Sequence, residues 1–284
     1  MQLELVDNMS RKLLSAIVPA MEKAEEVRIA VAFVSTGGIA LIDSALKQCL
    51  GRGGYVEFLV GLDLSTTEPQ ALWKLYELSQ SHTSVEIYCY TDLGPSVVYH
   101  PKLYILNAGE ETTAVLGSSN LTEGGLKRNL EVNAVIRAHI QEEFVSDVYA
   151  IYNELKFDPR RVEPDKEFLE LYTQLCENQK QQQRSAARDR SSRQLKVAFR
   201  EKTRTLRRPI PTQRDLYGWQ KLVFDRLPKG QFKTSDIYQF EDEFRRYYPD
   251  NQHIQDKIRQ ILQQLRDLNL IEHPKRNIWI KPGD

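Results

Sequence analysis

Cysteine is scarce in this sequence of 284 residues, which contains three, Cys49, Cys89 and Cys176. They are scattered and odd in number, and neither a CxxC motif nor a cluster of cysteine with histidine accompanies them. The pattern therefore indicates neither a disulfide framework nor a structural zinc site. We expect reduced, mostly buried thiols, and no metal or other cofactor.

Long apolar runs are also missing, since none approaches the roughly 20 residues that a membrane-spanning helix needs. The N-terminal segment MQLELVDNMSRKLL lacks the basic start and the apolar core of a signal peptide. We therefore expect a cytoplasmic protein without a membrane partner.

A net charge is absent too, because 39 Lys and Arg balance 39 Asp and Glu. The balance is uneven along the chain: residues 1–157 hold 12 basic and 20 acidic side chains, and residues 158–284 hold 27 and 19. Twelve basic side chains and two acidic ones lie between Lys180 and Arg214. Such a block suits contact with a polyanion, but it equally suits a solvated linker, and charge alone does not decide.

Residues 1–178 alternate between strand-like and helical patterns. Helices are expected over 8–26, 35–50, 68–81 and 141–157, and strands over 27–34, 55–62, 84–91, 100–107, 112–118 and 130–138. This alternation predicts an α/β fold in which helices flank a mixed sheet.

The rest of the chain divides into a polar segment and a compact C-terminal domain. Residues 179–210 are rich in Gln, Arg and Ser and predict a basic, partly helical linker. Residues 211–284 predict three helices, near 215–227, 233–248 and 250–269, followed by two short strands around a Pro-Lys-Arg turn. This order is that of a winged helix, a helix-turn-helix variant.

The stretch YHPKLYIL, residues 99–106, places His100 and Lys102 two residues apart on an expected strand. Side chains at positions i and i+2 share one face of a strand. Such a pair suits a phosphate site, although an H-x-K triplet alone is more often polar decoration of an exposed edge strand.

Two later segments strengthen the phosphate interpretation. VLGSSNLTEGG ends a strand and turns through Ser118 and Asn120, which supplies hydroxyls, an amide and free backbone N–H groups for an anion. NLEVNAVIR then offers Glu131 and Asn133 on one strand face. Taken singly, each segment reads as an ordinary turn or edge.

The order His, Lys, Asn, Glu, with H-x-K followed by G-S-x-N, resembles the phospholipase D superfamily over about residues 25–140. The lipases of that group carry an Asp soon after the Lys, whereas this chain has Ala108. The later Glu is instead similar to the metal-independent restriction endonucleases of the superfamily.

The resemblance implies roles for five residues. His100 would be the nucleophile and form a phosphohistidine. Lys102 and Asn120 would hold phosphate oxygens, Ser118 would help seat the phosphate, and Glu131 would hydrogen-bond the far nitrogen of His100. The mechanism needs a second histidine to protonate the leaving oxygen, and His100 alone of five histidines stands in an H-x-K setting. A homodimer through the nuclease domain would supply it.

Residues 216–281 resemble the C-terminal winged-helix domain of the methyladenine-dependent restriction endonuclease that cuts GATC, chiefly over YYPDNQHIQDKIRQILQQLRDLNLIEH. Its third helix has one apolar face, so its polar side chains are candidates for contacts with double-stranded DNA. The predicted DNA-binding residues are Asn251, Gln252, Gln255, Lys257, Arg259, Lys275 and Arg276.

The combined pattern predicts a metal-independent DNA endonuclease of type II restriction kind, with a linker that follows the phosphate backbone. Two alternatives remain: a lipid phosphodiesterase of the same superfamily, and a catalytically inactive DNA-binding regulator. The recognition sequence and any dependence on DNA methylation do not follow from the sequence.

Overall fold

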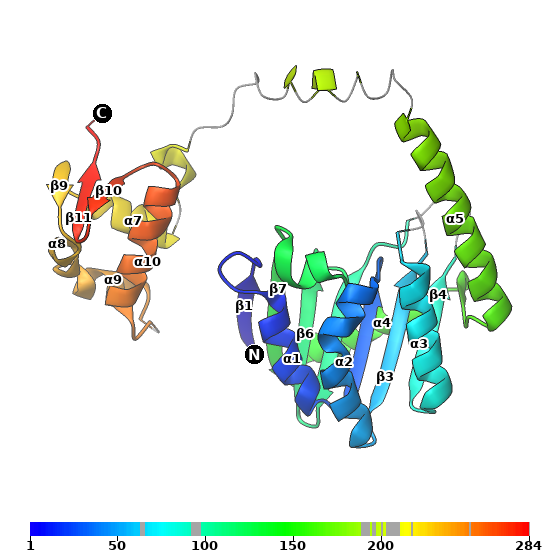
Figure 1. Ribbon diagram of the computed structural model, residues 1–284. Helices are drawn as coiled ribbons and strands as arrows, with labels where there is room; N and C mark the ends of the chain where they lie inside the picture. Colours follow the sequence, from blue (N-terminus) through cyan, green and yellow to red (C-terminus); the bar gives the residue numbers. More distant parts are fainter. Residues whose placement is uncertain are drawn as a thin grey trace. The chain divides into compact units, whose positions relative to one another are not determined.

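The computed structural model describes residues 1–62, 66–91, 98–188, 194, 197–199, 201–202, 211–216, 218–249 and 251–283 (Figure 1). The chain divides into two compact units, Met1–Arg193 and Gln194–Asp284. Much of the predicted linker 179–210 lies outside the described residues, so the boundaries of the three predicted segments stay a prediction.

A mixed sheet of eight strands forms the centre of the first unit, in the order β1-β7-β6-β5-β2-β3-β4-β8. Strands β2, β3 and β4 are parallel, and β2, β5, β6, β7 and β1 pair antiparallel in that order. Helices connect the parallel strands, because a parallel pair needs a crossover connection. The strands are β1 (Gln2–Val6), β2 (Glu26–Val31), β3 (Tyr55–Gly61), β4 (Val85–Tyr90), β5 (Lys102–Ala108), β6 (Glu111–Gly117), β7 (Asn133–His139) and β8 (Arg161–Val162).

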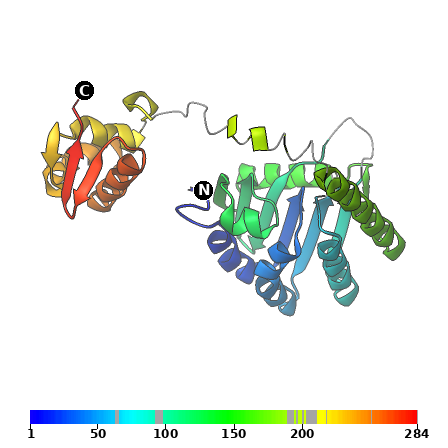
Figure 2. The ribbon, with the colours of Figure 1, turned by 45° about the horizontal axis from the view of Figure 1, so that its top comes forward.

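Helices cover the two faces of the sheet unequally. Helices α1 (Leu13–Lys23), α2 (Thr36–Gly51) and α3 (Pro69–Ser81) lie on one face, and α4 (Glu143–Lys156) lies on the other (Figures 1 and 2). The π-helix η2 (Gly124–Arg128) packs on α1 and α2, and α5 (Lys166–Arg188) packs on α3. The face with α1 to α3 is therefore the more fully covered one.

Strand β2 shows why its sequence is almost continuously apolar. Val27, Ile29 and Val31 join the core beneath α1 to α3, whereas Ala30 joins a second core with Val148 of α4. A strand that is buried on both faces has no position for regular alternation with polar residues.

The second unit has a three-stranded sheet in the order β10-β11-β9 and a core of its own. One face of α10 is buried, through Ile254, Ile258, Ile261, Leu262 and Leu265. Its elements are η3 (Gln213–Asp215), α7 (Gly218–Arg226), β9 (Gly230–Phe232), α8 (Thr234–Tyr238), α9 (Glu241–Tyr247), α10 (Ile254–Asp267), β10 (Glu272–Lys275) and β11 (Ile278–Lys281).

The predicted fold class is confirmed in both units, but four details differ. The helix expected over 233–248 is two helices, α8 and α9, separated at Gln239 and Phe240. Strands β1, β8 and β9 were not predicted. Strand β1 buries only Val6 deeply, β8 has two residues and β9 has three, so none of them carries a strong apolar signal.

Candidate active site and nucleic-acid interface

Four strand ends meet at one edge of the sheet in the first unit. The start of β5 pairs with the end of β2, through Lys102 and Val31. The end of β6 lies beside the start of β5, and the start of β7 lies beside the end of β6. This register brings the segments around His100, Ser118 and Glu131 to the same edge.

His100 and Lys102 lie together, although not within one strand. Strand β5 begins at Lys102, and His100 belongs to the segment just before it. The Lys102 Nζ lies 2.6 Å from Nδ1 and 2.9 Å from Nε2 of His100, and it donates to the His100 carbonyl oxygen at 2.9 Å. The Lys102 side chain is buried and the His100 side chain is exposed. The imidazole is therefore open to an incoming group, with an ammonium beside it.

The electrostatic surroundings favour a neutral imidazole. Partial desolvation of the imidazole by the surrounding protein lowers the pKa of His100, and the positive charge of Lys102 lowers this pKa further. Burial also lowers the pKa of Lys102, whereas the charge of Glu131 raises it. Histidine is a nucleophile only in its neutral form, so both effects on His100 suit that role.

Asn120 is oriented by a residue that the sequence did not single out. Its Oδ1 accepts a hydrogen bond from the Phe33 backbone N–H at 3.0 Å. The Phe33 ring also meets the His100 ring edge-on, with 5.7 Å between centroids. The Asn120 Nδ2 has no hydrogen-bond partner among the described residues, so it can donate to a phosphate oxygen. The only sequence signal for Phe33 is its place at the end of an expected strand.

Ser118 and Glu131 contact one another. The Glu131 carboxylate accepts hydrogen bonds from the Ser118 hydroxyl and, at 3.2 Å, from the Asn129 amide. The Ser118 Oγ in turn accepts from the Val132 backbone N–H at 3.0 Å. The expected hydrogen bond from Glu131 to His100 is not among those of the described residues. The charge of Glu131 acts instead on Lys102.

A buried network fixes the turn after β6. Asn133 accepts from the Ser119 backbone N–H at 3.2 Å and donates to the Ser119 Oγ at 2.9 Å. The Tyr104 hydroxyl of β5 donates to the Ser119 carbonyl at 3.1 Å. At Gly117 a Cβ would lie 2.4 Å from the Val132 carbonyl oxygen, so only glycine permits this approach. Asn133, which the sequence placed beside Glu131, is thus a buried support rather than part of the open site.

In the second unit, the predicted DNA-binding residues lie around α10 and the β10–β11 turn. Asn251 and Gln252 precede α10, and the Asn251 Oδ1 accepts from the His253 backbone N–H at 2.8 Å. Lys275 ends β10, and Arg276 follows it in the turn; both are exposed.

Three predicted DNA-binding side chains of α10 bond to neighbours. Gln255 donates to Glu241 at 2.9 Å, and Lys257 donates to Gln260 at 2.9 Å. Arg259 donates to the Tyr238 hydroxyl at 2.8 Å and pairs with Asp256. Because these contacts are largely exposed, each is worth little and can be exchanged for a contact with DNA.

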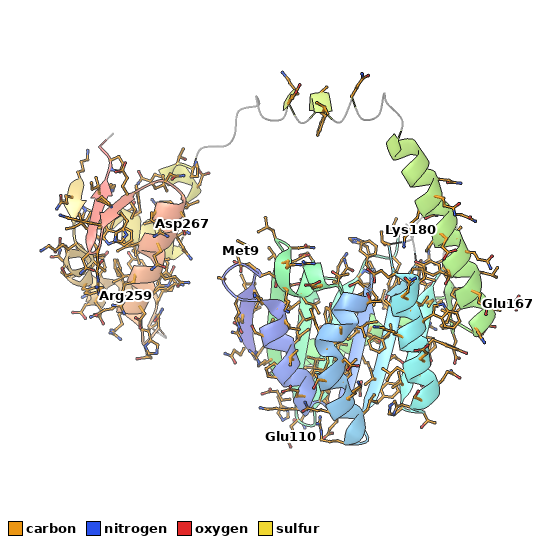
Figure 3. The ribbon with its side chains drawn as sticks, viewed as in Figure 1. Met9, Glu110, Glu167, Lys180, Arg259 and Asp267 are labelled. Atoms are coloured by element: carbon orange, nitrogen blue, oxygen red, sulfur yellow. The ribbon has the colours of Figure 1, made fainter. Side chains whose placement is uncertain are left out.

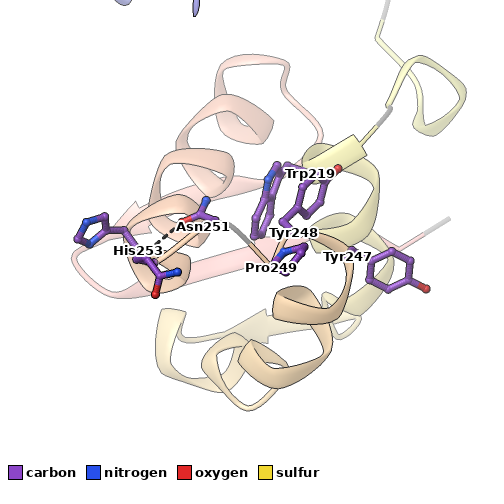
Figure 4. A pocket seen from close by; sticks show the side chains of 7 residues that line it. Trp219, Tyr247, Tyr248, Pro249, Asn251 and His253 are labelled. Atoms are coloured by element: carbon purple, nitrogen blue, oxygen red, sulfur yellow. Dashed lines mark hydrogen bonds between the residues drawn. The ribbon is translucent and has the colours of Figure 1, made fainter. Parts of the chain in front are cut away.

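An open pocket of about 580 Å³ lies at the start of α10 (Figure 4). Trp219 and Tyr248 stack in it with 4.4 Å between ring centroids. It presents flat aromatic surface beside polar groups, which suits a nucleic-acid base. The sequence identified only two of its residues as DNA-binding, because the aromatic ones, Trp219 of α7 and Tyr247 and Tyr248 at the end of α9, lie far apart along the chain. The lining residues are Trp219, Tyr247, Tyr248, Pro249, Asn251, Gln252 and His253.

The first unit matches a known family. Residues 17–156 fit the family model described as cardiolipin synthase, PLD-like domain. The chain contains a phospholipase D-like domain. Residues 218–281 fit the model of the Dam-replacing HTH domain, so the second unit is a winged helix of that kind.

Several solved structures are similar to the chain. NucT from Helicobacter pylori is 17% identical with a TM-score of 0.44, and the match covers 57% of this chain and 99% of that one. The phospholipase D family member Nuc from Salmonella typhimurium is 15% identical with a TM-score of 0.43, covering 58% and 99%. Phosphatidylserine synthase from Haemophilus influenzae Rd KW20 is 13% identical with a TM-score of 0.44, covering 66% and 46%.

The phospholipase D-like domain holds one histidine at this sheet edge. His139 ends β7, which starts at the site, so about 20 Å separates it from this edge at ~3.4 Å per residue. It lies 3.9 Å from Glu110, in the turn at the opposite end of the sheet (Figure 3). His82 follows α3 and precedes β4, at that same far edge. The remaining two histidines belong to the second unit.

The site combines a nucleophile, the His100 imidazole, with a cation, the Lys102 ammonium, and a hydrogen-bond donor, the Asn120 amide. Among the described residues, no three His, Cys, Asp or Glu side chains are grouped so that they could hold a metal ion. The helices in the described part of the chain include none that is both long and apolar enough to span a membrane. A phospholipase D-like domain joined to a Dam-replacing HTH domain supports phosphodiester chemistry on DNA.

Proposed function

We propose that the protein is a metal-independent DNA endonuclease of the restriction type, which acts through a phosphohistidine. The observation that carries this proposal is the arrangement of His100, Lys102, Asn120 and Glu131 around one sheet edge of a phospholipase D-like domain. A winged helix in the same chain provides a means to choose the DNA site.

In the first step, a neutral ring nitrogen of His100 attacks the phosphorus of a DNA phosphodiester. A bond between this nitrogen and phosphorus forms, and the bond from phosphorus to the leaving sugar oxygen breaks. Lys102 and the Asn120 Nδ2 donate to the non-bridging oxygens as negative charge develops on them. No metal is needed for these steps, because side chains provide the nucleophile and the charge stabilisation.

The leaving oxygen needs a proton, and a second histidine is the natural donor. We propose that a second copy of the chain supplies its own His100 for this purpose, since the other histidines of the phospholipase D-like domain lie at the far sheet edge. Water then attacks the phosphorus of the phosphohistidine, and the bond between phosphorus and the His100 nitrogen breaks. The histidine that gave its proton now accepts one from that water. The remaining hydroxyl stays on the phosphate, and His100 is regenerated.

Glu131 would support this chemistry through its charge on Lys102, and Ser118 through its hydrogen bond to Glu131. The carboxylate lies near enough to Lys102 to favour its charged form, which is the form that binds phosphate. Ser118 holds the carboxylate in place and is itself exposed at the site. We propose that Ser118 also contacts the bound phosphate.

The winged helix would read double-stranded DNA with the start of α10 in the major groove. Gln255, Lys257 and Arg259 would meet base edges or phosphates, and Lys275 and Arg276 would contact the backbone next to the groove. Asn251 and Gln252 lie in the aromatic pocket at the helix start, where they would border a base.

The decisive experiment incubates plasmid DNA with the purified full chain in EDTA. We expect cleavage that is unaffected by the chelator and is abolished in His100→Ala, with DNA binding unchanged in that variant. Sequencing of the cut ends from methylated and unmethylated DNA would give the recognition sequence and show whether methylation matters.

Other outcomes would support another function. Binding of DNA without any cutting would indicate an inactive regulator. Release of a headgroup from phospholipid vesicles, with no cleavage of DNA, would indicate a lipid phosphodiesterase.

A further inference from the structure

Residues 32–35 follow the end of β2 and connect the two parts of the candidate active site. They lie beyond the strand itself, so individual hydrogen bonds set the direction of their backbone. Their four backbone N–H groups donate, in order, to the Pro101 carbonyl at 3.0 Å, Asn120 Oδ1 at 3.0 Å, Thr67 Oγ1 at 3.3 Å and the Leu121 carbonyl at 3.0 Å. Three of these acceptors belong to the segments of His100 and Asn120, and the fourth is the hydroxyl of Thr67.

Thr67 lies outside both site segments and is deeply buried, at 1% exposed. Its hydroxyl accepts from the Val34 N–H and donates to the Gly61 carbonyl, at the end of β3, at 2.7 Å. A hydroxyl can do both because it has one donor and two acceptor lone pairs. Thr67 therefore joins the chain after β2 to the end of the neighbouring strand β3.

The hydroxyl of Thr67 contacts both peptide units that flank Phe33. The Val34 N–H belongs to the unit after Phe33, and the Ala32 carbonyl, 3.5 Å from Thr67 Oγ1, belongs to the unit before it. That earlier unit also carries the Phe33 N–H, and a peptide unit is planar. The position of the Thr67 hydroxyl therefore bears directly on where the Phe33 N–H points.

The Phe33 N–H in turn sets the direction of the Asn120 amide. Because Asn120 Oδ1 accepts this N–H, the Nδ2 is directed to the other side of the amide group. In the proposed function, that Nδ2 donates to a phosphate oxygen. A group placed about 1 Å away from its productive position can cost about 10²-fold in rate. Small movements of Phe33 should therefore matter for cleavage.

Helix α5 also holds Thr67. The Tyr172 hydroxyl donates to the Thr67 carbonyl at 2.8 Å, and Tyr172 is 6% exposed. The next residue, Glu68, donates its backbone N–H to the Val34 carbonyl at 3.0 Å, and its carboxylate accepts from the Thr36 N–H at 2.8 Å. Thr67 is thus held between α5 and residues 34–36, which leaves its hydroxyl little freedom to move.

We propose that Thr67 is a positioning residue: its hydroxyl holds the Phe33 N–H so that this group directs the Asn120 amide to the scissile phosphate. Thr67 acts through Phe33 and Asn120 and is too deeply buried to contact the phosphate itself. The inference rests on the proposed function, in which Asn120 stabilises charge on the phosphate. It adds a buried residue from another loop to those on which cleavage depends.

Single-turnover cleavage by the full chain tests this role with two changes at one position. Thr67→Val keeps the shape of the side chain and removes the hydroxyl, and its rate should fall about 10- to 100-fold. Thr67→Ser keeps the hydroxyl, and its rate should stay within about threefold of the unchanged protein. DNA affinity should stay within about twofold in both variants, because the change lies outside the winged helix.

Thr112→Val is the matched control. Thr112 is also 1% exposed, and its hydroxyl accepts from the Asn107 side chain at 3.0 Å, near the sheet edge opposite the site. This variant also loses a buried hydrogen bond, so it too should be less stable to urea, but its cleavage rate should be unchanged. An equal loss of rate in Thr112→Val and Thr67→Val would mean that lost stability alone explains the effect, and would overturn the inference.

A double-mutant cycle tests whether Thr67 acts through Asn120. In an Asn120→Ala background, the Thr67→Val change should lower the remaining rate less than about twofold, because the interaction that it disturbs is already gone. The same fall in rate with and without the Asn120 side chain would overturn the inference.

NMR provides a readout that needs no cleavage. The Asn120 side-chain amide signals, identified by their absence from Asn120→Ala, should move in Thr67→Val and move much less in Thr67→Ser and Thr112→Val. Hydrogen exchange of the Val34 amide should be at least about tenfold faster in Thr67→Val, because this amide loses its acceptor. Should Thr67→Val fail to fold, Tyr172→Phe removes the second hold on Thr67. The Asn120 signals should then move, and the cleavage rate should fall about threefold or more.

The two readouts separate the role of Thr67 from the proposed function. Unmoved Asn120 signals, or an unchanged rate in a protein that cuts DNA, would overturn the role of Thr67 and leave the nuclease intact. A loss of rate in Thr67→Ser as large as that in Thr67→Val would also overturn it. Moved Asn120 signals in a protein that never cuts DNA would keep the link between Thr67 and Asn120 and remove the proposed function.

Discussion

The two units of the molecule hold their candidate functional residues in opposite ways. In the phospholipase D-like domain they come from several strand ends and rest on buried groups such as Ser119 and Asn133. In the winged helix they are exposed along one helix and one turn and bond only to neighbours. Chemistry requires atoms fixed to a fraction of an ångström, whereas a reading surface gains from side chains that can exchange partners.

Charge also separates the two units. Residues 1–193 hold 20 basic and 27 acidic side chains, whereas residues 194–284 hold 19 basic and 12 acidic ones. A polyanion is attracted mainly by the second region. We therefore expect substitutions at the site of the first unit to lower cleavage without weakening DNA binding. Substitutions in the second unit should weaken binding without slowing cleavage.

The largest effect is expected for Lys102→Gln. Removing one charge-stabilising donor from an active site lowers kcat about 10²–10³-fold. DNA affinity should stay within twofold of the unchanged protein, because one phosphate contact is lost from a surface that has many. Single-turnover cleavage and a gel-shift titration measure the two quantities.

Lys47→Gln is the matched control for this change. Lys47 pairs with Asp43 on an exposed turn of α2, far along the helix from the site edge. Its rate and affinity should both be unchanged. Equal loss of binding and cutting in Lys102→Gln would contradict the separation of the two units.

Next in size is Asn133→Ala. The Asn133 side chain is 1% exposed. It accepts a hydrogen bond from the Ser119 backbone N–H and donates one to the Ser119 hydroxyl oxygen. Its loss leaves buried groups unsatisfied and should cost ~1–3 kcal/mol in the free energy of unfolding. Urea denaturation measures this cost, and cleavage by the folded fraction should fall as the turn carrying Asn120 loosens.

Asn153→Ala, at an exposed position of α4, provides the comparison for Asn133. It should change the free energy of unfolding by less than about 0.5 kcal/mol, as exposed substitutions usually do. An Asn133→Ala protein as stable and as active as this control would show that the buried network does not hold the site.

Tyr247→Ala should affect binding alone. Tyr247 is exposed and lines the aromatic pocket of the winged helix. Loss of one stacking surface costs ~1–3 kcal/mol per base, which corresponds to a fall in DNA affinity of about 5- to 150-fold. At saturating protein the single-turnover rate should be unchanged, and Phe157→Ala, an exposed aromatic of the first unit, should alter neither. A slower rate at saturation would show that the pocket also takes part in cutting.

Order along the chain indicates which candidate residues lie close together where consecutive strands are neighbours in the sheet. His100, Lys102, Asn120 and Glu131 occupy consecutive strand ends, and antiparallel pairing of β5, β6 and β7 brings consecutive ends together. The mixed sheet and the winged helix were predicted from the spacing of apolar residues and from the order of the helices and strands along the chain.

Residues that act through long-range contacts could not be predicted in this way. Phe33 orients Asn120 with its backbone N–H, which any residue but proline would provide. The aromatic pocket joins Trp219 to residues 247–253, and no periodicity marks that pairing. The partner of Glu131 was predicted as His100, yet the structure gives Ser118, because hydrogen bonds depend on side-chain direction as well as on the sheet edge.

The smallest effect concerns the protonation of His100 and tests the environment of the site without any cleavage. Partial desolvation and the charge of Lys102 both lower its pKa from the ordinary value of 6.5, so the ring should stay neutral below that pH. Replacing Lys102 by Gln removes the second cause but not the first. The pKa of His100 should therefore rise in Lys102→Gln, and the ring should become protonated at a higher pH. Proton NMR titration of the imidazole signals, with the His100 signal assigned by its absence from His100→Ala, measures both midpoints. A His100 midpoint that does not move, or moves to lower pH, would mean that the Lys102 ammonium does not face the ring in solution, and Lys102 and His100 could not then act on one phosphate.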